Sequence, residues 1–280
     1  MAGVKVVTDS SSDLPAELAE RHDISVVPLS IRFGEEEFVD RRDLTPAEFW
    51  ARCAQSPVLP ETSAPSPGAF EQVFRAAAEA GADGVICVNI SAKLSATSQS
   101  AQAAAQAVAD LIPVRVVDSR SATLGLGMTV LEASRLAAEG KTLDEVVAGA
   151  ENAIERTRVF GTLDTLENLK KGGRIGGAQA LLGSLLSIKP VIEVKDGAVE
   201  PGPKQRTRSR ALAYLVDKVA AETGGIDQLG VIHGAAPDLN QFLDMLSAHF
   251  PREKIVVGDI GPVVGAHTGP RTIAVAYQVS

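Results

Sequence analysis

The 280-residue sequence predicts an α/β protein with two domains, and three observations support this fold class. Residues 1–158 repeat the order strand, polar loop, helix, which is typical of a doubly wound parallel sheet in a three-layer α/β/α domain. Residues 159–280 mix a hairpin, helices and late strands, which is typical of an α+β domain. No linker-like composition separates the halves, so we expect the two domains to pack directly against each other.

The composition is that of a globular protein with an aliphatic core. Apolar residues make up 45% of the chain and charged residues 22%, but aromatic residues only 4%. A net charge of −8 argues against a nucleic-acid partner, which would need a cationic surface. The sequence has no secretory signal and no apolar run of membrane-spanning length, so we expect a cytoplasmic protein that is not an integral membrane protein. Cys53 and Cys87 fit neither a metal site nor a disulfide framework.

The first strand, loop and helix illustrate the repeated pattern. Val4–Val7 is a short apolar run, and the polar residues Thr8–Asp13 follow it. A helix over 16–22 comes next, with Asp13 as its expected N-cap. The polar loop lies beyond the strand's carboxyl end, where open α/β sheets bind ligands. It therefore either contacts a ligand or neighbouring loops, or simply caps the helix.

The other expected elements follow from hydrophobic periodicity, capping boxes and turn signals. In the first half we expect strands over 24–33, 84–90 and 114–117, with a hairpin tip near 34. We expect helices over 46–50, 69–80 and 122–139, another that ends near 111, and another that ends near 157. In the second half we expect strands over 159–163, 230–234, 254–257 and 272–279, a hairpin over 190–200, and helices over 178–188, 211–222 and 239–250. Gly125 and Gly127 predict a close approach of the 122–139 helix to another backbone.

Two hydroxyl-rich segments in the first half are candidate binding sites. Thr62 and Ser63 lie in a stretch whose prolines restrict the backbone, which suits a site presenting hydroxyls. Ser66 is explained as a helix N-cap, but this pair is not. Ser95 is one of five hydroxyl residues within 91–100, between a strand end and a helix N-terminus, where anions bind readily.

The stretch 259–270 contains three glycines and two prolines around His267 and Thr268. We expect an irregular loop between two strands. Glycine-rich loops often carry function, so this loop is either a site or a buried crossing point where only glycine fits.

Cations gather in two places in this acidic chain. Lys170, Lys171 and Arg174 lie among four glycines, and a second cluster consists of Lys204, Arg206, Arg208 and Arg210. The second cluster is either a solvated face or a contact for phosphate or an acidic partner.

Together these residues are hydrogen-bond donors rather than metal ligands, because no His, Cys and Asp cluster has ligand spacing. They favour an anion or carboxylate site. Nucleophilic catalysis by Ser95 with His267 as base remains an alternative. However, the sequence has no Gly-x-Ser-x-Gly motif and no obvious carboxylate to orient His267.

The chain resembles the DegV family of bacterial fatty-acid-binding proteins, the carrier subunits of fatty acid kinase. The matching motifs span nearly the whole sequence and are specific in this order. They are Thr8–Pro15, Thr62–Gly68, Leu94–Ala101, Val117–Ser119, Leu169–Ile175, Ile188–Pro190 and Gly265–Pro270.

The resemblance implies that a long-chain fatty acid binds in an apolar tunnel between the two domains. Its carboxylate would meet Thr62, Ser95 and His267, with Ser63 and Thr268 beside them. It also implies an ATP-dependent fatty acid kinase as partner, which converts the bound carboxylate to an acyl phosphate, and transient membrane contact is compatible with this role. Arg174 and Arg206 would contact the phosphate or the kinase. The carrier would need no cofactor and would supply no catalysis beyond positioning.

The sequence departs from the family pattern at four positions. Ala96 and Ser98 stand where Gly and Tyr are more usual, and Ala64 replaces a common glutamine. Arg271 stands where a glycine is usual, so it could alter the tunnel mouth or the charge balance at the carboxylate. None of the four removes a proposed donor.

Overall fold

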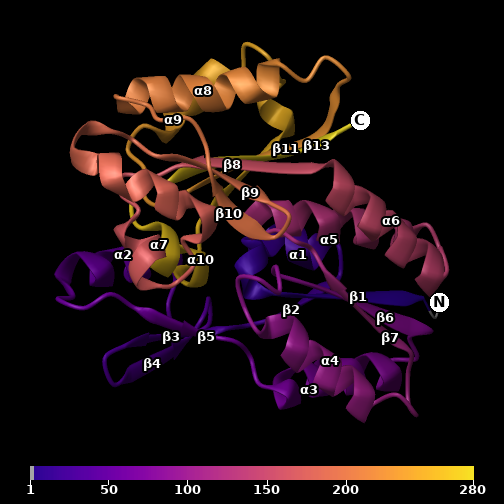
Figure 1. Ribbon diagram of the computed structural model, residues 1–280. Coiled ribbons are helices and arrows are strands. Elements are labelled where there is room, and N and C mark those ends of the chain that lie inside the picture. Colours follow the sequence, from indigo (N-terminus) through magenta and orange to yellow (C-terminus); the bar gives the residue numbers. More distant parts are fainter. Residues whose placement is uncertain (1–2) are drawn as a thin grey trace.

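The computed structural model describes residues 3–280, apart from the side chains of residues 183–187. It contains two large sheets, with a small third sheet at one side (Figure 1). The first sheet has the order β2-β1-β6-β7 and is entirely parallel. Its strands are β1 (Val4–Asp9), β2 (Ile24–Val27), β6 (Gly84–Asn89) and β7 (Val114–Asp118). The predicted parallel sheet of the first half is confirmed.

The second sheet is mixed and has the order β10-β9-β8-β13-β11-β12. Its strands are β8 (Thr157–Thr162), β9 (Val191–Lys195), β10 (Ala198–Pro201), β11 (Ile226–His233), β12 (Ile255–Asp259) and β13 (Ile273–Val279). Only β11 and β12 pair in parallel; the other neighbours are antiparallel. The third sheet, β4-β3-β5, consists of β3 (Ser30–Phe33), β4 (Glu36–Val39) and β5 (Glu61–Ser63). The predicted α/β fold class is therefore confirmed.

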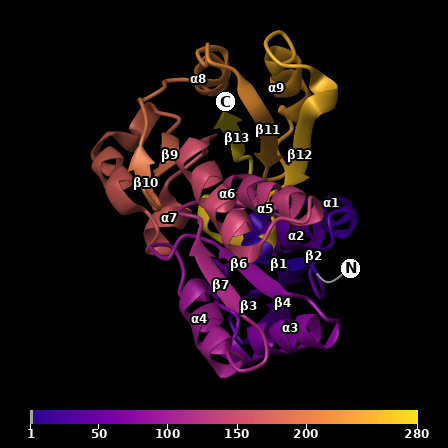
Figure 2. The same ribbon diagram turned by 90° about the vertical axis from the view of Figure 1, so that its right-hand side faces the viewer.

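The helices give the molecule five layers (Figure 2). One outer layer contains α3 and α4, the middle layer between the sheets contains α5 and α6, and the other outer layer contains α8 and α9. The α-helices are α1 (Ala16–Arg21), α2 (Pro46–Gln55), α3 (Pro67–Glu79), α4 (Thr97–Ala107), α5 (Thr123–Ala138), α6 (Leu143–Arg156), α7 (Glu167–Lys171), α8 (Arg208–Ala220), α9 (Leu239–Leu246) and α10 (Pro262–Thr268). The 3-10 helices are η1 (Ser10–Ser12), η2 (Gly176–Ser187) and η3 (Arg252–Lys254). No helix in the described part of the chain combines the length and hydrophobicity needed to cross a bilayer.

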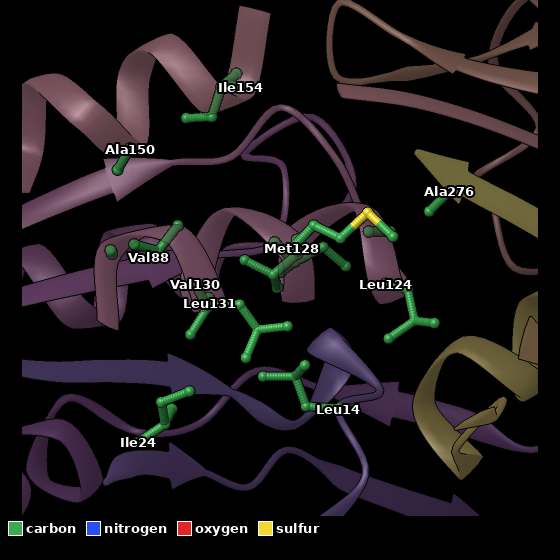
Figure 3. Packing of buried hydrophobic residues seen from close by; sticks show 14 of the residues in the cluster. Leu14, Ile24, Val88, Leu124, Met128, Val130, Leu131, Ala150, Ile154 and Ala276 are labelled. Atoms are coloured by element: carbon green, nitrogen blue, oxygen red, sulfur yellow. The ribbon is translucent and has the colours of Figure 1, made fainter. Parts of the chain in front are cut away.

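The middle helix α5 contacts strands of both large sheets. Its side chains from Thr123 to Leu131 are all buried, and Leu124 and Met128 belong to one core cluster with Val88 of the first sheet and Ala276 of the second (Figure 3). A Cβ at Gly127 would lie 2.9 Å from the carbonyl oxygen of Ser12, so the predicted close approach to another backbone is confirmed there. The cavity described below opens beside the first turn of this helix.

Asp13 joins the loops of the two halves instead of capping α1, so the predicted N-cap is wrong. Its buried carboxylate accepts hydrogen bonds from the backbone N–H of Gly261 at 2.9 Å, Arg41 Nη2 at 3.0 Å and Thr123 Oγ1 at 2.8 Å. Helix α1 has no side-chain cap. Burial of a carboxylate is costly unless it is paired; burial raises the pKa of Asp13, and these three donors offset part of that cost. Asp13 thereby fixes the residue that precedes α10.

Three other predicted elements differ from the structure. The expected strand 24–33 is two strands, because Pro28 has no N–H for a ladder and the chain then changes sheet. The expected α-helix over 178–188 is the 3-10 helix η2, and the small side chains at 183, 184 and 187 fall outside the description. The expected loop 259–270 contains the helix α10, which Gly261 precedes as N-cap and Pro262 begins.

Candidate functional site

A cavity of about 190 Å³ lies between the two large sheets and contacts both halves of the chain. Most of its described lining is aliphatic. These residues are Leu29, Ala64, Ile90, Leu94, Ala96, Ala122, Val159, Leu163, Leu169, Ile192, Val194, Val199, Ile232, Ile260, Val263, Val264 and Ala274. No Phe, Tyr or Trp side chain is among the described residues of the wall. Such a surface suits a flexible hydrocarbon chain, because it buries apolar area without large aromatic rings that would stack on a planar ligand.

The floor of the cavity is a row of residues across four strands of the second sheet. Gly161 pairs with Ile192 on one side and with Ala274 on the other, and Ala274 pairs with Ile232. All four line the cavity. Two small residues between two isoleucines form a trough, and a Cβ at Gly161 would lie 3.2 Å from that of Ala274. A larger side chain at either central position would fill part of the cavity.

Thr62 and His267 meet in the wall of this cavity. Thr62 lies in β5 and pairs with Ile31, whereas His267 lies in the last turn of α10. The distance between Thr62 Oγ1 and His267 Nε2 is 2.9 Å. Burial, and secondarily the charge of Arg174, lowers the pKa of His267 to about 4. The imidazole is therefore neutral at pH 7.

Arg174 connects this pair to the segment that carries Ser95. Its Nε donates to the carbonyl oxygen of Leu94 at 2.9 Å, and its Nη1 donates to that of Gly172 at 2.7 Å. Ser95 Oγ lies 2.8 Å from Thr97 Oγ1. Arg174 and Ser95 both line the cavity, as Thr62 and His267 do. The structure thus brings together the predicted residues Thr62, Ser95, His267 and Arg174.

The remaining predicted site residues are placed less centrally. Ser63 and Thr268 line the cavity, but Thr268 Oγ1 donates to the carbonyl oxygen of Val264 at 3.2 Å. Arg206 is exposed and does not line the cavity. The polar residues 8–13 do not line it either, although they are buried. Of the hydroxyls within 91–100, only that of Ser95 is in the wall.

Arg271 forms an ion pair beside the cavity rather than inside it. Its Nε lies 3.1 Å from Asp164 Oδ2, and Lys189 Nζ lies 2.8 Å from Asp164 Oδ1. Arg271 has a φ of 61°, a left-handed conformation that favours glycine. The ion pair with Asp164 therefore holds a residue whose backbone is strained.

Sequence reasoning missed most of the cavity wall. The aliphatic residues come from many separate segments, and each belongs to an ordinary strand or helix pattern. Thr123 and Thr272 also line the cavity, but Thr123 Oγ1 donates to Asp13 and Thr272 Oγ1 donates to the carbonyl oxygen of Thr268 at 3.1 Å. Gly161 is a local signal that could have indicated part of the wall, because a glycine inside a strand often marks a close approach.

The arrangement can hold an elongated apolar molecule that has an anionic or polar head. The hydroxyls, the neutral imidazole and the guanidinium provide donors for the head, and the aliphatic wall accepts the rest. Among the described residues, no group of three or more His, Cys, Asp or Glu side chains is arranged to hold a metal ion.

The fold and the site define an α/β protein with an aliphatic cavity between a parallel four-strand sheet and a mixed six-strand sheet. The chain belongs to the DegV family, whose model, described as an uncharacterised protein of the DegV family, matches residues 3–280. A DegV domain-containing protein of Streptomyces coelicolor is 39% identical over 278 residues, which cover 98% of this chain and 98% of that protein.

Solved structures of the family have the same architecture. A DegV family protein of Thermus thermophilus, described by its fatty acid binding, is 37% identical with a TM-score of 0.91, covering 99% of this chain and 100% of that chain. DegV of Bacillus subtilis, a fatty acid binding protein, is 29% identical with a TM-score of 0.89 and full coverage of both chains (100% each). A stearic-acid-binding protein of Eubacterium ventriosum is 28% identical with a TM-score of 0.88, covering 99% of this chain and 98% of that chain.

Proposed function

We propose that this protein binds a long-chain fatty acid, with the acyl chain in the cavity between the two sheets and the carboxylate at Thr62, Ser95 and His267. The observation that carries the proposal is the aliphatic cavity whose wall contains the contact between Thr62 and His267, with Ser95 and Arg174 in the same wall. The fatty acid binding of the relatives from Thermus thermophilus, Bacillus subtilis and Eubacterium ventriosum supports it.

The donors fit a carboxylate without requiring a charged histidine. In the Nε2–H tautomer, His267 donates to Thr62 Oγ1, and the Thr62 hydroxyl donates onward to the ligand. The Ser95 hydroxyl is a second donor, and Ser63 and Thr268 lie beside these residues at the wall. Arg174 carries the positive charge that compensates the carboxylate, since hydrogen bonds to ionised groups are the stronger ones.

In the fuller form of this proposal, the protein presents the bound carboxylate to an ATP-dependent fatty acid kinase, which forms an acyl phosphate. The phosphate adds negative charge at the head of the lipid, and Arg174 would meet it there. Arg206, exposed at the surface, would contact the kinase or its nucleotide. The carrier contributes positioning, and the kinase contributes the chemistry. The protein would act in the cytoplasm as a non-enzymatic subunit.

An acyl hydrolase with Ser95 as nucleophile and His267 as base is less well supported. Ser95 Oγ pairs with Thr97 Oγ1, whereas His267 Nε2 pairs with Thr62. A pKa of about 4 makes His267 a weak base. Its Nδ1 has no hydrogen-bond partner among the described residues, so no carboxylate orients the ring.

Lipid extraction tests the proposal. We expect mass spectrometry of the purified protein, extracted with organic solvent, to find a near-stoichiometric long-chain fatty acid. The delipidated protein should bind added palmitate, stearate or oleate and gain thermal stability from it. A protein that carries no fatty acid and binds none of the three would contradict the proposal. An acyl-enzyme burst with an activated ester, lost in Ser95→Ala, would favour the hydrolase instead.

A further inference from the structure

We infer that Gly172 is a positioning residue for His267: its lack of a side chain lets the imidazole lie against the main chain and reach Thr62. Gly172 belongs to the glycine-rich segment 169–177, from which the proposed function uses only the cavity-lining residues Leu169 and Arg174. The inference deepens the proposed function and rests on it for the ligand, but its geometric part can be tested without any ligand.

The contact between Gly172 and the imidazole leaves no room for a side chain. A Cβ on Gly172 would lie 2.9 Å from Cε1 of His267 and closer still to Nδ1. It would also lie 3.0 Å from the carbonyl oxygen of Asn168. Real Cβ atoms essentially never approach other atoms so closely, so the ring would have to move.

Gly172 is itself held in place by hydrogen bonds on both sides of its Cα. Its backbone N–H donates to the carbonyl oxygen of Asn168 at 2.8 Å, and its carbonyl oxygen accepts from Arg174 Nη1 at 2.7 Å. Asn168 Nδ2 in turn donates to the carbonyl oxygen of Ala266 at 3.2 Å. Helix α7 and the turn after it are therefore fastened to α10 next to His267, so Gly172 cannot easily withdraw.

Helix α10 cannot withdraw on its other side either. A Cβ at Gly265 would lie 2.8 Å from Phe49 Cε1 and 2.9 Å from Trp50 Cη2, so α2 packs directly against the main chain of α10. Because the backbones on both sides are fixed, the imidazole can yield to a new methyl group only by rotating. Rotation would take Nε2 away from Thr62 Oγ1.

The neighbouring glycine provides a matched control. Gly173 has a φ of +71° and would have no atom within 4 Å of an added Cβ. Gly173→Ala therefore strains the backbone but does not touch the imidazole, whereas Gly172→Ala touches the imidazole. Gly172 itself has a φ of −73°, which alanine adopts without strain. An effect confined to Gly172→Ala therefore reports the ring, and an effect shared with Gly173→Ala reports a general disturbance of the turn.

The test combines histidine NMR with a mutant cycle. The chain has four histidines, so the imidazole resonances of His267 can be assigned by its own substitution, with the other three as internal references. In Gly172→Ala we expect the ring resonances of His267 to shift and its pKa to rise as the ring becomes more exposed. In Gly173→Ala both should stay as in the wild type.

Binding of stearate and oleate by calorimetry gives the second readout. Gly172→Ala should weaken binding about tenfold, because a tenfold change in affinity corresponds to the loss of about one hydrogen bond to an ionised group. In the His267→Ala background the same change should alter affinity by less than about twofold, because the atom it displaces is gone. Gly173→Ala should have the same small effect in both backgrounds.

The outcomes separate this inference from the proposed function. Unchanged His267 resonances in Gly172→Ala, or an equal loss of affinity in the wild-type and His267→Ala backgrounds, would overturn the role of Gly172. If the wild-type protein binds neither stearate nor oleate, the proposed function fails. The NMR comparison, and the same cycle measured on the free energy of unfolding, would still decide whether Gly172 positions the ring.

Discussion

Thr62 Oγ1 and His267 Nε2 lie 2.9 Å apart although 205 residues separate them in the sequence. Thr62 comes from the small three-strand sheet, and His267 comes from the last turn of α10. The contact joins two segments that otherwise belong to different halves of the protein. Because it forms in the wall of an aliphatic cavity, it is where the proposed function can be tested most directly.

Removal of either partner should weaken fatty-acid binding. We expect Thr62→Val and His267→Ala each to cost about 1–3 kcal/mol of binding free energy, because each breaks a partly buried hydrogen-bond chain to the carboxylate. The double variant should cost less than the sum of the two. Calorimetry with a long-chain fatty acid measures this. Thr268→Val is the comparison: its hydroxyl already donates to Val264, so its effect should be smaller, and an equal effect would contradict the relay.

A side chain at Gly161 should change which fatty acids fit. Gly161→Val would fill the trough between Ile192 and Ala274, so we expect the bound lipids to become shorter or fewer. Mass spectrometry of extracted lipid measures the change. Ala276→Val is the control, since it overcrowds the neighbouring strand β13 at a fully buried position outside the cavity wall. Identical lipid profiles in wild type and Gly161→Val would rule out the trough as a determinant of chain selection.

Arg174 should influence the protonation of His267. The wild-type imidazole should titrate near pH 4, below the ordinary 6.5, because burial and the Arg174 charge disfavour its cation. Since the folded-state pKa is lowered, this group's contribution to stability is lost as pH falls from about 6.5 through 4.

NMR titration measures both the wild type and its variant. In Arg174→Gln the pKa should rise toward the ordinary value, and in the control Lys170→Gln, at an exposed lysine, it should not change. A His267 that titrates near 6.5 in the wild type would contradict the buried, neutral imidazole.

Asp40 should make the protein more stable in mild acid than in mild alkali. It is 2% exposed, and burial is the largest cause that raises its pKa to about 7. The folded state therefore holds this proton more tightly than the unfolded state, whose carboxyl titrates near 3.8. The contribution to stability is full below about pH 4 and is lost as pH rises through 7.

Asp40→Asn should remove this dependence and stabilise the protein at pH 8 by on the order of 2 kcal/mol. Urea unfolding at pH 5 and pH 8 checks it. Asp43→Asn is the control, because the hydrogen bond from Arg42 lowers the pKa of that exposed carboxyl. A wild-type protein whose Asp40-dependent stability rises toward pH 8 would contradict the sign.

Local patterns predicted much of the fold because their causes are local. Capping boxes, one of the signals for the predicted helices, form at Thr45 and Thr142, and the hairpin predicted over 190–200 turns at Asp196 and Gly197. The stretch 259–270 was predicted as a loop because its glycines and prolines disfavour helix. The structure overrides that preference: Pro262 suits a first turn, and Gly265 allows the close packing of Trp50.

The candidate site was less accessible to pattern alone. Hydroxyls at 62 and 95 and the histidine at 267 indicate donors, but the pattern alone leaves both an anion or carboxylate site and nucleophilic catalysis open. Periodicity does not encode which distant residues meet. Neither the contact of Thr62 with His267 nor the close packing of Gly172 against the imidazole could therefore be derived from spacing. Asp13 was misread for the same reason, since its partners Arg41, Thr123 and Gly261 are remote in sequence.

Helix α5 is buried against both large sheets, and its core cluster contains residues of both halves, such as Val88 and Ala276. Neither half therefore has a complete core of its own. Heating should produce a single cooperative transition, and a fragment ending at residue 158 should expose the face of α5 that the second sheet covers. Each fragment should become soluble only when the other is co-expressed with it, so the two halves should fold as one cooperative unit rather than as two independent domains.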